Sequence, residues 1–294
     1  MNTTPVFKKT RIAPTPSGFL HLGNALSFSI TAALARKLNA KILLRIDDLD
    51  RERTGKAYVQ DIFDTLNFLE IPWHEGPRNY ADYEAQYSQM YRLPLYSDAL
   101  KKLKEAGQLF ACSCSRNQVG GIYPGTCRDK NISFDKENVS WRLKTDPSQE
   151  ITVNTLDKGI VKTRLPATMQ DFVVRKKDGY PAYQLASVID DLHFGADLVV
   201  RGEDLWESTL AQLYLASMLP ANDFQNTIFY HHGLLTANGD QKLSKSAGDT
   251  SVHYLRSQGK KPADIYSGIA TMLGYSELVG NWKQLGELLL LHRK

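Results

Sequence analysis

The chain has 294 residues, of which 42% are hydrophobic and 23% are charged, a balance typical of a soluble globular protein. No apolar run is long enough to span a membrane, and the basic residues near the N-terminus lack the apolar stretch of a secretory signal, so we expect a cytoplasmic protein. The formal net charge of +4 is compatible with a nucleic-acid partner but is too small to indicate one.

The first part of the chain predicts a βαβ unit. Residues 11–13 and 41–46 read as short apolar strands on either side of an amphipathic helix that starts near Gly23. Short apolar strands of this kind are typical of a parallel sheet. We therefore assign residues 1–108 to the first half of a nucleotide-binding domain.

Two further helices are expected before residue 108. The first covers residues 54–69 with Thr54 as its N-cap. The second covers residues 83–106, is broken or bent before Pro94, and ends at Gly107.

The remainder divides into three parts. Residues 109–166 lose helical periodicity and read as an insertion, residues 167–246 as the second half of the nucleotide-binding domain, and residues 247–294 as a short helical C-terminal segment. The expected elements are a hairpin over 171–183 with an Asp-Gly turn, helices over 183–192 and 206–219, a strand over 197–200, and helices over 252–258 and 262–273.

Two short strings carry the features of a nucleotide site. A Pro/Gly turn, Pro14-Thr-Pro-Ser-Gly-Phe-Leu-His-Leu-Gly-Asn24, directly precedes the first helix, whose N-terminus offers unpaired N–H groups and a positive dipole to a phosphate. His21 can donate to phosphate oxygens, and Gly23 has no Cβ where a flat base would approach. The second string, Lys242-Leu-Ser-Lys-Ser246, supplies the ammonium groups of Lys242 and Lys245. Taken singly, the strings could also be a turn histidine and a solvated basic loop.

Together the two strings resemble the HIGH and KMSKS signatures of the class I aminoacyl-tRNA synthetases. Further blocks at residues 11–18, 44–53, 183–191 and 199–205 are similar to the glutamyl branch, and the resemblance spans residues 11 to about 275. It implies an α/β fold with a Rossmann-like, doubly wound parallel sheet, an inserted zinc-containing subdomain and a short helical C-terminal cap. It also implies that ATP with Mg²⁺ contacts His21, Gly23, Lys242 and Lys245, and that His21 and Lys245 stabilise the charge that develops in catalysis.

Two arginines at predicted strand ends, Arg11 and Arg201, can each form a fork with a carboxylate. The resemblance implies that glutamate is contacted by Arg11, Ala13, Thr15, Asp47, Tyr183 and Arg201. The alternative is that the arginines form structural ion pairs with Asp47, Asp48 or Glu203.

Position 47 departs from the family pattern, which usually has Glu where this chain has Asp47. The shorter side chain leaves a gap of about 1.5 Å to the substrate ammonium. Either the substrate lies deeper, or water fills the gap, or the amino acid differs.

All three cysteines, Cys112, Cys114 and Cys127, lie close together, which argues against a disulfide framework and for a local metal site. Zinc prefers four ligands, and no histidine occurs between His74 and His193, so Tyr123 is the nearest candidate for the fourth. The alternative is three free thiols. The pattern is similar to the zinc site of the glutamyl-queuosine tRNA(Asp) synthetases, a truncated branch of the glutamyl synthetases.

This branch resemblance implies the function: ATP activates glutamate, and the glutamyl group is transferred to the queuosine of tRNA(Asp). Residues 247–294 are fewer than the roughly 100 of an independent domain, so we expect a small cap in place of an anticodon-reading module, and a monomer. The alternatives are a short glutamyl-tRNA synthetase that charges an acceptor end, a catalytically idle paralogue that binds RNA, and a generic nucleotidyltransferase.

Overall fold

A computed structural model describes residues 7–237, 241–242 and 251–291. The chain forms two compact units. Unit 1 comprises residues 1–91, 198–203 and 231–294, and unit 2 comprises residues 92–197 and 204–230. No helix among the described residues combines the length and apolar character needed to cross a membrane.

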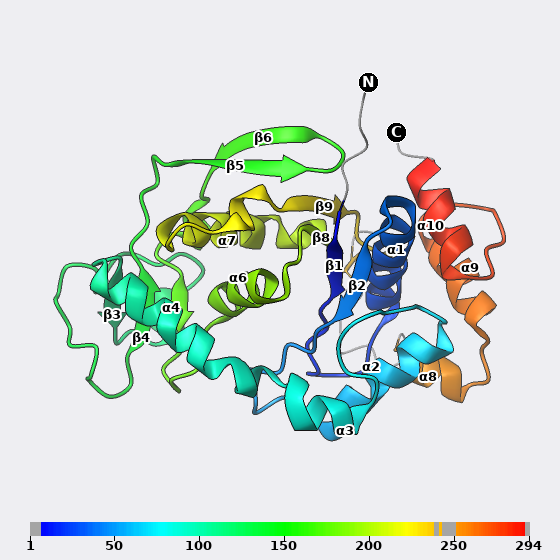
Figure 1. Cartoon of the computed structure of the whole chain (residues 1–294), viewed down its shortest axis with the longest axis horizontal. Helices are drawn as coiled ribbons and strands as arrows, with labels where there is room; N and C mark the ends of the chain where they lie inside the picture. Colours follow the sequence, from blue (N-terminus) through cyan, green and yellow to red (C-terminus); the bar gives the residue numbers. More distant parts are fainter. Residues whose placement is uncertain (1–6, 238–240, 243–250, 292–294) are drawn as a thin grey trace. The chain divides into compact units, whose positions relative to one another are not determined.

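Unit 1 is built on three parallel strands in the order β2-β1-β8 (Figure 1). These are β1 (Lys9–Ile12), β2 (Lys41–Leu44) and β8 (Leu198–Gly202), and α1 (Leu22–Leu38) joins the first two. The strands are short and almost entirely buried, although β1 (Lys-Thr-Arg-Ile) contains a single apolar residue. The predicted βαβ unit is therefore confirmed, and the fold belongs to the α/β class with a mostly parallel central sheet.

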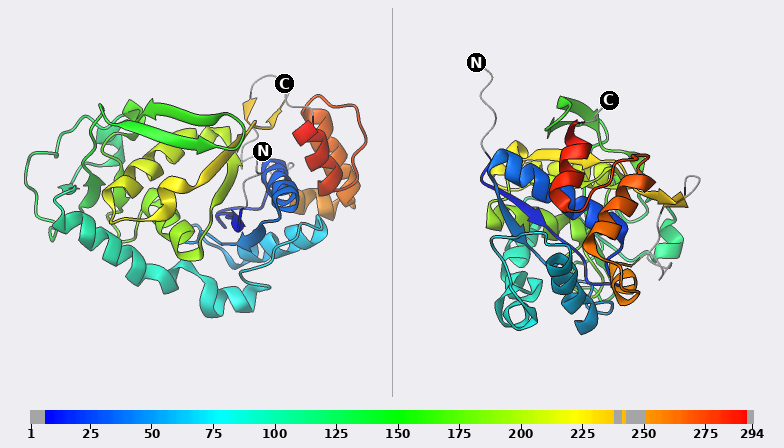
Figure 2. Two further views of the ribbon diagram at one scale, coloured as in Figure 1. Left: turned by 45° about the horizontal axis from the view of Figure 1, so that its top comes forward. Right: turned by 90° about the vertical axis from the view of Figure 1, so that its right-hand side faces the viewer.

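A helical pair, α9 (Pro262–Met272) and α10 (Trp282–Leu291), packs along α1 (Figure 2). The approach of α10 is very close at Gly286, because a Cβ there would lie 2.1 Å from the Cβ of Ala33. Two hydrogen bonds anchor the pair, from the Tyr266 hydroxyl to the Leu69 carbonyl (2.5 Å) and from the Trp282 indole to the Glu70 carbonyl (2.9 Å). Helix α9 was predicted from the sequence, whereas the residues of α10 were included in the predicted helical segment 247–294 without being assigned to a helix of their own.

The N-cap predicted for the second helix, Thr54, is wrong. Helix α2 (Lys56–Phe68) has Gly55 as its N-cap, without a side-chain hydrogen bond. The Thr54 hydroxyl instead donates to the carbonyls of Asp48 (3.3 Å) and Asp50 (3.0 Å), which fixes the preceding loop. The helix therefore starts later than expected.

The remaining elements of unit 1 are short. They are α3 (Tyr80–Asp82), a π-helix (Tyr83–Tyr87), a 3-10 turn (Gln89–Arg92), the strand pair β10 (Thr236–Ala237) and β11 (Gln241–Lys242), and α8 (Val252–Ser257).

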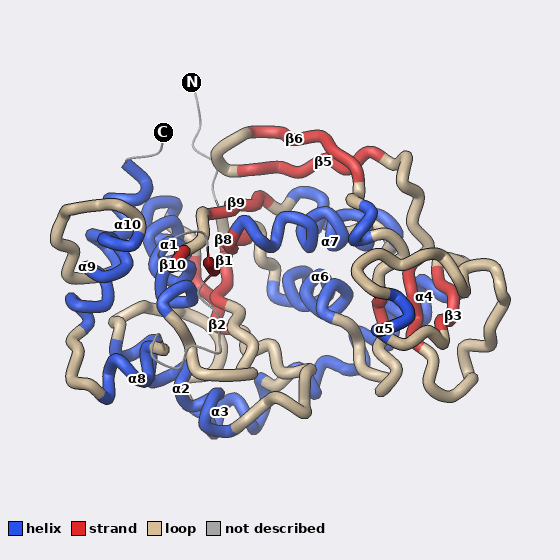
Figure 3. Tube along the Cα trace, turned by 180° about the vertical axis from the view of Figure 1, so that it is seen from behind, coloured by secondary structure: helices blue, strands red, loops and turns tan. Residues whose placement is uncertain are grey.

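Unit 2 combines a helical pair with two small groups of strands (Figure 3). Helices α6 (Tyr183–Phe194) and α7 (Trp206–Met218) pack on each other, and α4 (Leu93–Glu105) packs on α6. Pro94 lies in the first turn of α4, so the predicted break before this proline is confirmed.

The strands of unit 2 are mostly antiparallel. A three-stranded sheet has the order β3-β4-β7, with β3 (Leu109–Cys112), β4 (Ser140–Leu143) and β7 (Val173–Arg175). Strands β5 (Glu150–Thr155) and β6 (Gly159–Arg164) form a hairpin, and β9 (Ile228–His232) runs parallel to β5. The short helices are α5 (Arg116–Val119) and 3-10 turns at Ala167–Met169, Glu203–Leu205 and Asp223–Asn226. The predicted hairpin over 171–183 is present as one bridge between Arg175 and Pro181.

Candidate functional site

Three predicted glutamate contacts lie at one edge of the sheet in unit 1. The strands are parallel, so their carboxyl ends share this edge, where Arg11 lies in β1, Arg201 in β8, and Asp47 just after β2. Nη1 of Arg11 donates to the carbonyl of Val200, next to Arg201 in the chain, at 3.2 Å. The exposed fractions of Arg11, Asp47 and Arg201 are 6%, 8% and 4%, so this edge holds two buried guanidinium groups and a carboxylate.

Asp47 has a partner that the sequence analysis did not identify. Nε of Arg45 lies 2.7 Å from Oδ1 of Asp47, and Nη2 of Arg45 lies 3.1 Å from Oδ2, so the pair forms a buried fork. The backbone N–H groups of Arg45 and Asp47 bond to the carbonyls of Ile12 (2.9 Å) and Pro14 (3.0 Å), which extends the contact between the two segments beyond the strands. Residues two apart on an extended segment point to one face, so the spacing could have indicated this pair.

Asp48 is a structural hub. Its carboxylate is fully buried and accepts hydrogen bonds from the hydroxyls of Tyr83 (2.7 Å) and Ser88 (2.6 Å) and from the N–H of Gln89 (2.7 Å). It also forms an ion pair with Arg51 at 2.7 Å. This ion pair is structural, but it involves Arg51 and not Arg11 or Arg201, the two arginines for which structural ion pairing was the alternative.

His21 is the N-cap of α1, which begins close to the predicted start at Gly23. Its Nδ1 accepts from the N–H of Gly23 at 3.1 Å, and its own N–H donates to Oδ1 of Asn24 at 3.0 Å. A neutral imidazole whose Nδ1 is an acceptor carries its proton on Nε2, so the other ring nitrogen is a donor. A Cβ at position 23 would lie 2.9 Å from Cε1 of His21, so any larger residue there would force the histidine ring to shift.

The other predicted contacts are placed less completely. Ala13 and Thr15 lie on the loop after β1, with Thr15 exposed. Tyr183 belongs to unit 2, where it is the first residue of α6 and 44% exposed. Lys245 and the side chain of Lys242 lie outside the described residues. Their roles stay predictions.

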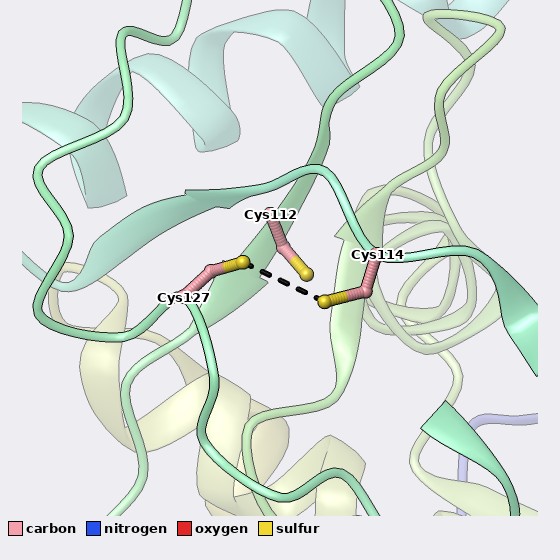
Figure 4. A group of neighbouring side chains, drawn as sticks. All are labelled: Cys112, Cys114 and Cys127. Carbon is pink, nitrogen blue, oxygen red and sulfur yellow. Dashed lines mark hydrogen bonds between the residues drawn. The ribbon is translucent and has the colours of Figure 1, made fainter. Parts of the chain in front are cut away.

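The three cysteines of unit 2 form one cluster (Figure 4). Their sulfur atoms lie within 4.8 Å of one another, and Sγ of Cys114 is 3.6 Å from Sγ of Cys127. Three thiolates at the usual Zn–S distance of about 2.3 Å around a tetrahedral ion lie about 3.8 Å apart, so the set fits zinc. Strand β3 positions Cys112, and Phe110 lines the cluster with apolar surface.

Tyr123 lies beside this cluster. Its hydroxyl oxygen accepts from the N–H of Cys127 at 2.8 Å and interacts with the Cys112 thiol. It is 8% exposed, and its ring lies under the guanidinium of Arg142, whose Cζ is 3.8 Å from the ring centre. A hydroxyl oxygen therefore lies beside the cysteine cluster, and the role of Tyr123 as the fourth zinc ligand stays a prediction.

Protonation differs among the thiols. Burial raises the pKa of Cys114 to about 11, and hydrogen bonds with the neighbouring thiols act in the same direction. Burial alone would raise the pKa of Cys127, but hydrogen bonds from Ser113 and from the other two thiols lower it to about 7. The Cys127 thiol therefore ionises more readily than the Cys114 thiol.

A residue missed by the sequence analysis lies under the His21 turn. Asp61 of α2 is fully inside, and its Oδ2 accepts from the N–H of Leu20 at 2.9 Å. The sequence offered one sign of this residue, because Asp61 is an acid on the buried face of a helix whose other buried residues are apolar or Thr65. Its hydrogen-bond partner, Leu20, is too distant in the sequence to be predicted.

Comparisons with known proteins agree with this geometry. A family model described as "tRNA synthetases class I (E and Q), catalytic domain" matches residues 8–281. The chain is 36% identical to a glutamyl-Q tRNA(Asp) synthetase of Parasynechococcus marenigrum, over 90% of this chain and 83% of the relative. It is 32% identical to glutamate–tRNA ligase 2 of Syntrophus aciditrophicus, over 94% of this chain and 59% of the ligase.

The solved structures show the same fold. A glutamate tRNA ligase from Elizabethkingia meningosepticum superposes with a TM-score of 0.73 at 20% identity, over 95% of this chain and 64% of that protein. The chain thus spans about three fifths of the length of the ligases it matches.

Proposed function

The chain belongs to the class I tRNA synthetases, as a catalytic domain of the glutamate and glutamine type, and on this premise we propose that it activates glutamate with ATP and transfers the glutamyl group to the queuosine of tRNA(Asp). The transfer to tRNA is supported by the names of the relatives. The choice of queuosine is supported by the relatives named glutamyl-Q tRNA(Asp) synthetase, which align over 80% or more of their own length.

The observation that carries the proposal is the pair Arg11 and Arg201 at one edge of a parallel sheet. Both guanidinium groups are buried, and a hydrogen bond from Arg11 reaches the residue before Arg201. Two fixed cations at the carboxyl end of such a sheet suit a ligand with two carboxylates, because a guanidinium pairs with a carboxylate through two parallel hydrogen bonds. Glutamate carries two carboxylates and has one more to offer than glutamine.

In the first step, an oxygen of the glutamate α-carboxylate attacks the α-phosphorus of ATP. A carbon–oxygen–phosphorus linkage forms, the bond between the α- and β-phosphates breaks, and pyrophosphate leaves with its electrons. No bond to the protein is required, so the protein acts by positioning and by stabilising charge. Nε2–H of His21 would donate to a phosphate oxygen, and the positive dipole end of α1 would favour the phosphate charge, with Mg²⁺ supplied as the counterion of ATP.

In the second step, a hydroxyl of the queuosine attacks the activated carbonyl. The ester bond forms, the bond to the phosphate breaks, AMP leaves, and the hydroxyl proton is released. Zinc held by Cys112, Cys114, Cys127 and Tyr123 would cross-link the insertion of unit 2, since the cluster joins β3 to the loop that follows it.

The test uses ATP, labelled glutamate and purified tRNA(Asp) with or without queuosine. We expect label in tRNA(Asp) only when queuosine is present. Label at the acceptor end of tRNA(Glu) would refute the transfer to queuosine and indicate an ordinary glutamyl-tRNA synthetase. If no glutamyl-adenylate forms, the protein is a catalytically idle paralogue.

A further inference from the structure

Asp61 links two segments of unit 1 that are far apart in the sequence. Its side chain, on α2, is 1% exposed. Oδ2 accepts from the N–H of Leu20, the residue before His21, at 2.9 Å. Oδ1 faces α8, where Nδ1 of His253 lies at 3.7 Å and Nη2 of Arg256 at 3.8 Å.

The same two segments are also joined directly. The N–H of Val252 donates to the carbonyl of Leu20 at 2.8 Å, and His21 and Ser251 form an antiparallel bridge. The ring of Phe19 stacks on that of His253, with centres 4.2 Å apart and planes 12° apart. The turn before α1 and the start of α8 are thus connected by backbone, rings and a shared carboxylate.

A carboxylate is costly in this position. Burial is the largest influence on the pKa of Asp61 and raises it, while the Leu20 N–H and the cations Arg256 and His253 act in the opposite direction. The residue therefore contributes little to the stability of the fold by its charge. Its clear structural effect is on the geometry of the turn, because it holds the backbone one residue before His21.

We propose that Asp61 is a positioning residue for the activation of glutamate, acting through His21. The inference rests on the proposed function. Asp61 fixes the backbone of the Phe19–His21 turn against α8, and the position of this turn sets where Nε2–H of His21 meets a phosphate of ATP. In the sequence, α8 begins at Val252, downstream of the string Lys242-Leu-Ser-Lys-Ser246. The reaction depends on positioning, so small displacements of the turn lower the rate.

Asp64 provides a matched control. It lies one helical turn along α2, also pairs with Arg256 (3.4 Å), and has a side chain that is 41% exposed. Asp64 thus shares Arg256 with Asp61, but the hydrogen bond described for the N–H of Leu20 goes to Asp61 and not to Asp64. Asp61→Asn keeps an oxygen that can accept from Leu20 and removes the charge, whereas Asp61→Ala removes both.

The experiment is glutamate-dependent ATP–pyrophosphate exchange with the full chain, with circular dichroism as a check of folding. We expect Asp61→Ala to lower kcat roughly tenfold or more, with less than about a twofold change in the KM for glutamate. Asp61→Asn should lower kcat by about threefold, and Asp64→Asn should match the wild type. A merely structural role would lower the active fraction and leave kcat per folded molecule unchanged.

Two outcomes overturn the inference. One is a folded Asp61→Ala protein with a kcat within twofold of the wild type. If Asp61→Ala does not fold, equal kcat values for Asp61→Asn and Asp64→Asn overturn it. An inactive wild-type protein is a different result, because it refutes the proposed function itself.

Discussion

The buried pair of Arg45 and Asp47 leads to a prediction that separates stability from substrate binding. Asp47→Ala removes one partner of a fork with N–O distances of 2.7 and 3.1 Å, between side chains that are 2% and 9% exposed. The guanidinium then stays buried without its carboxylate. Breaking a buried ion pair in this way costs about 3–5 kcal/mol, whereas replacing both partners by apolar groups is close to neutral.

We therefore expect Asp47→Ala to lose about 3–5 kcal/mol of unfolding free energy, and the double variant Arg45→Met/Asp47→Ala to recover most of it. The binding of glutamate should follow a different pattern. If Asp47 accepts the substrate ammonium, the double variant regains stability but keeps a raised KM for glutamate, because the carboxylate is still missing. The KM for ATP should change little in either variant.

Urea unfolding and ATP–pyrophosphate exchange measure the two effects on the same preparations. A loss below about 1 kcal/mol in Asp47→Ala would refute the account of the pair, as would a double variant no more stable than the single one. A double variant that regains wild-type KM for glutamate would remove Asp47 from the binding site. Asp47→Glu tests the unusual length at this position, and we expect it to keep or improve glutamate affinity.

Three further predictions concern packing, metal and pH. Gly286→Ala should destabilise the protein by about 1–3 kcal/mol, because its Cβ would lie 2.1 Å from the Cβ of Ala33 on the facing helix. Gly268→Ala is the control: no atom lies within 4 Å of its added Cβ, so the stability should be unchanged or rise by up to about 1 kcal/mol. Thermal unfolding measures whether each variant is less or more stable than the wild type. Cys127→Ser should abolish zinc binding, and Tyr123→Phe should weaken it at least about tenfold, as measured by metal analysis after dialysis. An unchanged zinc affinity in Tyr123→Phe would exclude the tyrosine oxygen as the fourth ligand. Folding raises the pKa of Asp61, so the wild type loses stability as the pH rises from about 4 through the pKa of the folded state. The stability of Asp61→Asn relative to the wild type should therefore increase from pH 4 to pH 7. A difference in unfolding midpoint that stays constant over this range would contradict the prediction.

The βαβ core could be predicted because its signals are local. Two short strands flank a helix that follows a Pro/Gly turn. The helix was predicted to be amphipathic, but it is buried without a break from Phe28 to Ala35, because α10 also packs on it. Helix α10 was missed because its Leu-rich end gives little periodicity, and Gly286 looks like a helix breaker until the facing helix is seen. Thr54 resembled an N-cap, but its hydroxyl is taken by two carbonyls of the preceding loop.

In the candidate site, too, the features that could be predicted are those with local signals in the sequence. The cysteine cluster lies within a short stretch of chain, so its spacing indicated the grouping that the structure confirms. The arginines could be placed at one edge because parallel strands end together. Asp61 could not be identified, since its role depends on Leu20 and on α8, and no local pattern in the sequence links these segments.

Whether two buried arginines bind both carboxylates of glutamate can be measured by ATP–pyrophosphate exchange with glutamate, with glutamine, and with glutamate in an Arg201→Gln variant. We expect exchange with glutamate and at least about a hundredfold less with glutamine, because a buried guanidinium would lose its carboxylate. A similar loss is expected with glutamate in the variant. Equal exchange with both amino acids, or an Arg201→Gln protein as active as the wild type, would contradict it.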